Sequence, residues 1–418
     1  MAGNRFSLSL QLLRTRRFGT FWFASLLSSI GTWAQQVAQP WLMLSLGASS
    51  FLLGLDAFAM GAPVLTLTLV GGMLADRADR RRVIALFQSI QMLCPTLIVL
   101  LLLTGAVRPW MIIAASLVVG ITDALSMPSY QSIVPSIVER DQLAAGIALN
   151  ATQFNLSRIL GPAVAGVLMV SMGAAGAFAV SAASYIPFIL VALWILPAAR
   201  ADHGADRRFD RHELLSVLRK VLRDPVLRGG LLTVLATSTL GAPLLTFAPV
   251  FIKVALQGNV GHFSLAVGAL GVGGLLGAIA LLGIGPRHDR RPLAAGLAAA
   301  YAGLVILTAL DPWFWGLLPL LVLAGATMTA SNSSANALLQ ASAPEDIRGQ
   351  TVSLFMLAVR GGSSIGSLLT GLCVGALGVR RALLLNGILA VLAQWAIGRA
   401  WCRAGRAGPM TAQPSRRD

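Results

Sequence analysis

The chain has 418 residues, of which 56% are hydrophobic and only 11% are charged, whereas about a quarter of the residues of an average soluble domain are charged. This composition excludes a water-soluble globular protein. The formal net charge of +16 does not indicate nucleic acid binding either, because the basic residues are spread over separate short loops between apolar blocks.

The apolar blocks predict an all-α membrane protein with twelve transmembrane helices, each near the 20 or so residues that cross a bilayer core. We place these spans at 20–46, 51–74, 83–104, 109–128, 143–170, 174–196, 227–252, 263–285, 293–310, 314–340, 349–373 and 382–398. Most lysines and arginines then fall on the side that holds both termini and the loops after even-numbered spans. The positive-inside bias predicts that this side is cytoplasmic.

The longest hydrophilic stretch divides the chain near its midpoint. We expect an N-terminal six-helix half at 1–196, a cytoplasmic linker at 197–226, a C-terminal six-helix half at 227–398 and a basic cytoplasmic tail at 399–418. Within the linker, one helix face carries apolar residues, namely Leu214, Leu215, Val217, Leu218, Val221 and Leu222. This pattern predicts an amphipathic helix, which we expect to lie on the cytoplasmic leaflet.

The two halves repeat each other in pattern. Gly120 and the run SYQSIVPSIVERD at 129–141 match Gly325 and SANALLQASAPED at 334–346, and Asp79-Arg80-Arg81 recurs as Asp289-Arg290-Arg291. Two six-helix halves in a parallel repeat enclose a central pathway, which is the architecture of alternating-access carriers.

Neither a metal site nor a cofactor is indicated. The three cysteines form no CxxC motif and no extracytoplasmic pair, and the four histidines lie in loops without ligand spacing. The sequence has no GxxxxGK[ST] loop for a nucleotide. We therefore expect no enzyme, no metal and no cofactor.

The segment GGMLADRADRRR at 71–82 resembles the loop signature of the major facilitator superfamily, and it lies where that family has it, between spans 2 and 3. Three longer segments resemble the transmembrane secretion effector branch, which includes enterobactin-exporter-like proteins. They are GTWAQQVAQPWLMLSLGASSFLLGL at 31–55, AGIALNATQFNLSRILGPAVAG at 145–166 and ANALLQASAPEDIRGQTVSLFMLAVRGGSSIGSLLTG at 335–371. The resemblance implies the major facilitator fold and secondary active export.

The 71–82 loop predicts a conformational latch formed by Gly72, Asp76, Arg77, Arg80 and Arg81. Gly72 allows helices to approach closely, and the Asp76 carboxylate can accept hydrogen bonds from a helix N-terminus. The expected acceptor is the start of span 11 near Arg348 and Gly349. The alternative is that the arginines only anchor the topology.

Ionisable residues within spans are functional candidates, because a charge there costs several kcal/mol unless it is paired or hydrated. They are Asp56 in span 2, Asp123 in span 4, Arg158 in span 5 and Arg360 in span 11. We expect Asp123 and Arg158 to pair, with Asp123 as the proton-responsive carboxylate and Asp56 as a further coupling candidate. A static ion pair or snorkelling to an interface is the alternative.

Neutral polar residues at helical spacing are candidates for the substrate cavity, because spans 1, 4, 7 and 10 line the cavity in the resembled fold. With Arg360 of span 11, the candidates are Gln35, Gln39, Asn155, Thr233, Thr237, Asn332 and Asn336. Hydrogen bonding between helices is the alternative. In span 5, Gly161, Pro162 and Gly166 form a surface suited to tight helix packing.

The sequence thus predicts a monomeric, multi-pass carrier of the bacterial inner membrane with both termini in the cytoplasm. We expect it to export an amphipathic small molecule, such as a drug-like compound or a siderophore, against inward proton flow. The alternatives are an uptake symporter or lipid-handling carrier and, more distantly, a non-transporting membrane scaffold or sensor.

Overall fold

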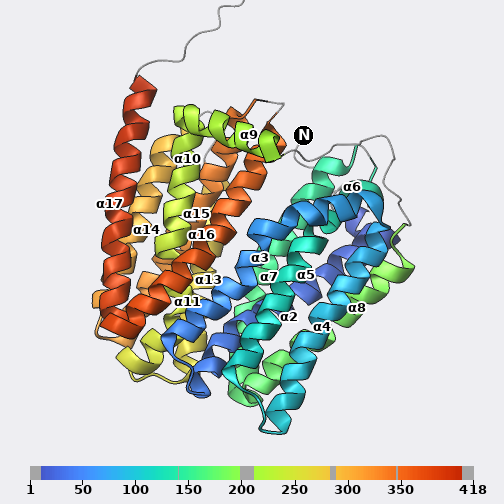
Figure 1. Ribbon diagram of the computed structural model, residues 1–418, viewed down its shortest axis with the longest axis horizontal. Helices are drawn as coiled ribbons and strands as arrows, with labels where there is room; N and C mark the ends of the chain where they lie inside the picture. Colours follow the sequence, from blue (N-terminus) through green and yellow to red (C-terminus); the bar gives the residue numbers. More distant parts are fainter. Residues whose placement is uncertain (1–10, 140, 198–210, 283–288, 345–346, 407–418) are drawn as a thin grey trace, which may run out of the picture.

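The computed structural model describes residues 11–139, 141–197, 211–282, 289–344 and 347–406, and every regular element within these ranges is helical. The first half contains α2 (Arg16–Ser45), α3 (Ser50–Arg77), α4 (Arg80–Leu103), α5 (Pro109–Gln131), the short α6 (Ile133–Ile137), α7 (Leu143–Ser171) and α8 (Gly173–Trp194). These helices form one bundle, coloured blue to green in Figure 1.

The second half begins with a broken span, which is made of α10 (Pro225–Ala236), the π-helix η1 (Thr237–Gly241), α11 (Pro243–Thr246), α12 (Ala248–Val250) and the π-helix η2 (Phe251–Ala255). It continues with α13 (Val260–Leu282), α14 (Arg290–Leu310), α15 (Phe314–Ser342), α16 (Arg348–Leu377) and α17 (Val379–Arg406). This second bundle lies beside the first (Figure 1).

In the described part of the chain, eleven helices are long and apolar enough to cross a membrane. Helix α2 is not among them, because Gln35, Gln36 and Gln39 lower its mean hydropathy. It is nevertheless 30 residues long and packs against α7 and α8 within the first bundle. The arrangement agrees with the predicted all-α membrane fold of two six-helix halves.

Span 7 differs from the single helix predicted at 227–252. Pro243 and Pro249 lack a backbone N–H, so neither can continue the hydrogen-bond ladder of the helix before it. The chain responds with short helical pieces and two π-helical turns, and π-helical turns are frequent at functional sites. The break carries Leu245 and Thr246 to the wall of a cavity between the halves.

The sequence repeat is visible in helix starts and helix crossings. Asp79 caps α4 by accepting a hydrogen bond from the Arg81 backbone N–H at 3.2 Å, and Asp289 caps α14 in the same way from Arg291 at 3.0 Å. The hydrogen bond from the Arg291 side chain holds the pKa of the Asp289 carboxyl below its usual value.

Two repeated glycines stand where helices cross closely. A Cβ atom at Gly120 in α5 would overlap the Met60 carbonyl of α3, and one at Gly325 in α15 would overlap the Leu270 carbonyl of α13. Both halves therefore use a glycine to let the equivalent pair of helices approach.

The two halves meet where α3 packs against α16 and α7 packs against α13. Gly54, Gly61 and Gly371 form a glycine seam between α3 and α16, in which a Cβ at Gly54 would lie 2.5 Å from the Ser367 carbonyl oxygen and one at Gly371 would lie 2.8 Å from that of Ser50. The seam runs toward the end of the bundle where α3 begins and α16 ends.

The opposite ends of α3 and α16 have free space around them. Gly72 and Gly349 would each accommodate a Cβ with no atom within 4 Å, and Arg348 is exposed. The halves are thus packed closely at one end of α3 and α16 and not at these two positions near the other end.

The linker forms α9 (Arg211–Arg223), and residues 198–210 lie outside the described residues. Val217 and Val221 are buried in a cluster with Leu231, Leu339 and Phe355 of the second half. Helix α9 therefore packs on the end of the second bundle (Figure 1) through Val217 and Val221. The reason is that the ends of α10, α15 and α16 offer an apolar surface that these residues can cover. The position of α9 on the cytoplasmic leaflet stays a prediction.

Candidate functional site

A cavity of about 230 Å³ lies between the two halves. Its walls come from α2, α3 and α7 of the first half and from α11, α13 and α15 of the second. Most lining residues are apolar, including Leu53, Met60, Phe263, Leu270 and Met328, and its two ionisable residues are Asp56 and Arg158. A cavity of this composition suits a ligand that is largely apolar but carries polar or charged groups.

Asp56 reaches the cavity from α3 and is only 6% exposed. Its Oδ2 accepts a hydrogen bond from Gln39 Nε2 of α2 at 2.7 Å, and its Oδ1 accepts one from Ser116 Oγ of α5 at 2.6 Å. Behind Gln39, the side-chain oxygen Oε1 of Gln35 accepts a hydrogen bond from Ser181 Oγ of α8 at 2.8 Å. Neutral donors from neighbouring helices therefore hold a buried carboxylate at the cavity wall.

Arg158 reaches the same cavity from α7. Its guanidinium carbon lies 5.7 Å from the centroid of the Trp33 ring of α2, which is the geometry of a cation–π contact. Within the described ranges, no carboxylate lies at ion-pair distance from Arg158. Gly161, one turn along α7, allows this contact between helices, because a Cβ there would overlap Trp33.

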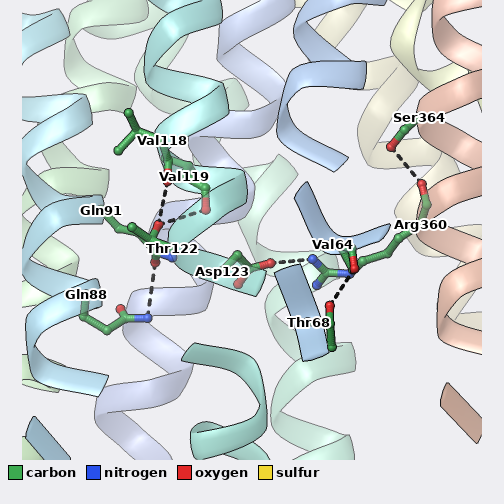
Figure 2. Close-up of polar contacts among 10 residues, drawn as sticks. All are labelled: Val64, Thr68, Gln88, Gln91, Val118, Val119, Thr122, Asp123, Arg360 and Ser364. Carbon is green, nitrogen blue, oxygen red and sulfur yellow. Dashed lines mark hydrogen bonds and ion pairs between the residues drawn. The ribbon is translucent and has the colours of Figure 1, made fainter. Parts of the chain in front are cut away.

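Asp123 of α5 pairs with Arg360 of α16 and so joins the two halves (Figure 2). Arg360 Nη1 donates to Asp123 Oδ2, and the two side chains are 34% and 37% exposed. Ser364 Oγ donates to the Arg360 carbonyl oxygen at 2.8 Å, one turn along α16. The pair is therefore partly open to solvent and is the sort of contact that a movement between the halves would break.

The direct pairing predicted between Asp123 and Arg158 is corrected by this geometry. The prediction assumed that sequential spans face each other, but α5 packs mainly against α3 and α4, while α7 packs against α2, α8 and α13. Asp123 consequently faces the second half and Arg158 faces the cavity.

The other predicted cavity residues divide into two groups. Gln39 lines the cavity, whereas Gln35 lies behind Gln39. Pro162, which was predicted for helix packing, also lines the cavity. Thr233 and Thr237 are buried, and Gln394 Nε2 of α17 donates to the Thr233 backbone carbonyl oxygen and to Thr237 Oγ1, each at 3.0 Å. These two threonines therefore take part in hydrogen bonding between helices, which was the alternative to substrate contact.

The predicted asparagines do not line this cavity. Asn336 accepts a hydrogen bond from Gln340 of the same helix at 3.1 Å, and the buried Oδ1 of Asn332 has no hydrogen-bond partner among the described residues. The side chain of Asn155 lies outside the described residues.

The predicted latch loop is described in part. Arg80 Nε donates to the Ala75 carbonyl at 3.3 Å, and Arg81 Nε donates to Asp79 at 2.9 Å. The side chains of Asp76 and Arg77 lie outside the described residues.

In α7, Gly166 packs across the interface between the halves. A Cβ there would lie 2.8 Å from Ser264 Cβ of α13. Together with Gly161, it makes α7 a helix that packs closely on both α2 and α13.

Sequence reasoning missed several cavity residues. Trp33, Met60 and Met328 gave no signal, because an aromatic or methionine residue in a membrane span is usually lipid-facing or core. Ser116, which donates to Asp56, could have been found as a polar residue in an otherwise apolar stretch of span 4.

Comparison with known proteins places these features in a family. The family described as transmembrane secretion effector matches residues 7–413. The Staphyloferrin A transporter of Staphylococcus aureus is 22% identical over 383 residues, which cover 88% of this chain and 92% of the relative. The enterobactin exporter EntS of Citrobacter koseri is 25% identical over 377 residues, which cover 87% of each chain.

The fold is also that of solved transporters. A bacterial homolog of the human lysosomal transporter Spinster, solved in an inward-facing and unoccupied conformation, has a TM-score of 0.72 and 17% sequence identity. The match covers 94% of this chain and 98% of that chain.

Proposed function

Because the chain belongs to the transmembrane secretion effector family of major facilitator transporters, we propose that it is a proton-coupled exporter of an amphipathic small molecule. It works by alternating access in the bacterial cytoplasmic membrane, with both termini in the cytoplasm. The observation that carries this proposal is the apolar cavity with two charged residues between the halves. The name of the relative EntS, an enterobactin exporter, supports export as the direction of transport.

Coupling to protons is assigned to Asp123. Its carboxylate holds Arg360 of the opposite half, and protonation removes the charge on which this ion pair depends. Arg360 stays charged throughout, because a guanidinium does not lose its proton in proteins. Proton binding at Asp123 therefore loosens the link between α5 and α16, and proton release restores it.

The energy available is sufficient for export. A membrane potential of 100 mV supplies about 2.3 kcal/mol for each proton that enters, which supports a concentration ratio of about 50-fold. One proton per transported neutral molecule is then enough for useful efflux.

The test is accumulation of a panel of radiolabelled amphipathic compounds in energised inverted membrane vesicles. Accumulation should require this protein and should stop when a protonophore collapses the gradient. A matched preparation of Asp123→Asn should show strongly reduced gradient-driven accumulation. Accumulation that persists with the protonophore contradicts proton coupling, and accumulation only in right-side-out vesicles contradicts export.

A further inference from the structure

The two charges of the cavity, Asp56 and Arg158, have opposite signs and do not pair with each other. Asp56 accepts from Gln39 and Ser116, whereas Arg158 lies over Trp33. A buried carboxylate has about four lone-pair sites, of which two are used here. Both charges therefore keep the capacity to bind a complementary group of a ligand.

We propose that this cavity recognises a zwitterionic amphipathic molecule, with its cationic group on Asp56, its anionic group on Arg158 and its apolar body between them. This inference rests on the proposed function as a small-molecule carrier and specifies its substrate class. A ligand with only one charge covers the other charged residue of the cavity but gives it no opposite charge. Removing a charge from water without such a partner is unfavourable in an apolar site.

The positions of two neighbouring residues in α2 indicate the spacing between the ligand's two charges. The neighbours of the charged residues, Trp33 for Arg158 and Gln39 for Asp56, are both in α2. Their positions differ by six residues, which corresponds to about 9 Å along a helix. The ligand thus carries its two charges at opposite ends of an extended apolar body rather than on adjacent atoms.

The internal repeat shows that the carboxylate of α5 has no equivalent at the cavity wall. The repeat alignment that pairs Gly120 of the first half with Gly325 of the second half also pairs Asp123 with Met328. The carboxylate with which α5 neutralises Arg360 therefore has no equivalent in α15, and Met328 instead lines the cavity that Arg158 faces. The second half therefore supplies an apolar residue at this position, and no carboxylate of α15 lines the cavity that Arg158 faces.

The polar residues of the remaining wall fit the middle of such a ligand. Gln36, Thr246 and Thr329 are uncharged and line the cavity among apolar side chains. They can accept or donate hydrogen bonds but offer no charge that competes with Asp56 or Arg158 for the ligand's ends.

The experiment measures binding to the purified protein in nanodiscs without any proton gradient. The probe is radiolabelled 8-aminooctanoic acid, an apolar chain with an ammonium at one end and a carboxylate at the other. Its competitors are the methyl ester, which keeps only the ammonium, and the N-acetyl derivative, which keeps only the carboxylate. The zwitterion should bind about tenfold or more tightly than either, because each charge-assisted contact is lost in one competitor.

The variants assign each end of the ligand to a residue. Asp56→Asn should abolish the preference over the N-acetyl derivative and keep the preference over the ester, and Arg158→Gln should do the reverse. Met328→Asp places a second carboxylate in the cavity that Arg158 faces, so it should also reduce the preference over the ester. Met328→Asn, which has nearly the same shape without the charge, should retain that preference.

The comparison of compounds on the unaltered protein does not depend on any variant folding. If either singly charged compound binds as tightly as the zwitterion, the inference is overturned in favour of a cationic or an anionic substrate. Gradient-driven export without a zwitterion preference refutes this inference alone. A zwitterion preference without export in energised vesicles refutes the proposed function instead.

Discussion

Replacing Gly54 by alanine should shift the protein away from the conformation in which α3 and α16 touch. A Cβ at this position would lie 2.5 Å from the Ser367 carbonyl oxygen, whereas ordinary contact begins at 3.4 Å. The obstacle is backbone, so it cannot move aside as a side chain can, and the two helices must separate by about 1 Å. Overpacking of this kind costs about 1–3 kcal/mol.

The size of the shift follows from that cost. In an alternating-access carrier the seam between α3 and α16 is closed in one state and open in the other, so the added methyl group is unfavourable in the closed state alone. A difference of about 1–3 kcal/mol changes the ratio of the two states by about 5- to 150-fold. The matched control is Gly375→Ala in α16, where a Cβ meets no atom within 4 Å.

The assay is double electron–electron resonance on spin labels placed at exposed positions in a cysteine-free background. One pair, at Ser49 and Leu377, reports the end of α3 and α16 that lies near the glycine seam. The other pair, at Met73 and Ser353, reports the opposite end. Gly54→Ala should lengthen the first distance and shorten the second, while Gly375→Ala should leave both unchanged. Distance distributions for Gly54→Ala that match those of the control would refute the role assigned to the seam.

Three further predictions concern coupling, the latch loop and topology. Asp123→Asn and Arg360→Gln should each reduce gradient-driven transport, and the double variant should be no worse than either single variant. The expected coupling energy between the two residues is about 1–2 kcal/mol, because the pair is partly exposed. Additive losses in vesicle assays would show that the pair does not act as a unit. Asp76→Asn should insert normally but transport poorly, because it weakens contacts that close the end near Gly72, and near-normal transport in reconstituted vesicles would contradict the latch. Cysteines placed in the 197–226 linker should react with an impermeant reagent only from the cytoplasm and those at 47–50 only from outside, and the opposite pattern would reverse the predicted orientation.

The positions of the helices could be predicted because the membrane imposes one requirement on every span. A stretch of about 20 apolar residues must form a helix that satisfies its own backbone hydrogen bonds. The predicted span 109–128 thus corresponds to α5, Pro109–Gln131, and the predicted span 314–340 to α15, Phe314–Ser342. Span 7 was the exception, because Pro243 and Pro249 mark a break but do not specify the π-helical turns that accommodate it.

The partners of the charged residues could not be predicted in the same way. Helical spacing places Gln35 and Gln39 on one face and Thr233 and Thr237 on another, but it does not say which neighbour each face meets. Gln39 meets Asp56 at the cavity, whereas Thr237 meets Gln394 of α17. The rotation of a helix about its axis depends on its packing with all its neighbours at once. Apolar residues such as Met328 influence this rotation as much as polar residues do.

The internal repeat separates what the fold requires from what transport requires. Helix caps at Asp79 and Asp289 and helix crossings at Gly120 and Gly325 are present in both halves, because each half must build the same bundle. The ion pair of Asp123 and Arg360 has no such counterpart, since the equivalent positions are Met328 and Asn155. One interface between the halves therefore carries this charge pair, which under the proposed function is broken by a proton. At the other, Arg158 faces the cavity with no carboxylate at ion-pair distance in the described part of the chain. The two proposals thus assign coupling and substrate recognition to different residues, and we expect substitutions to alter them independently.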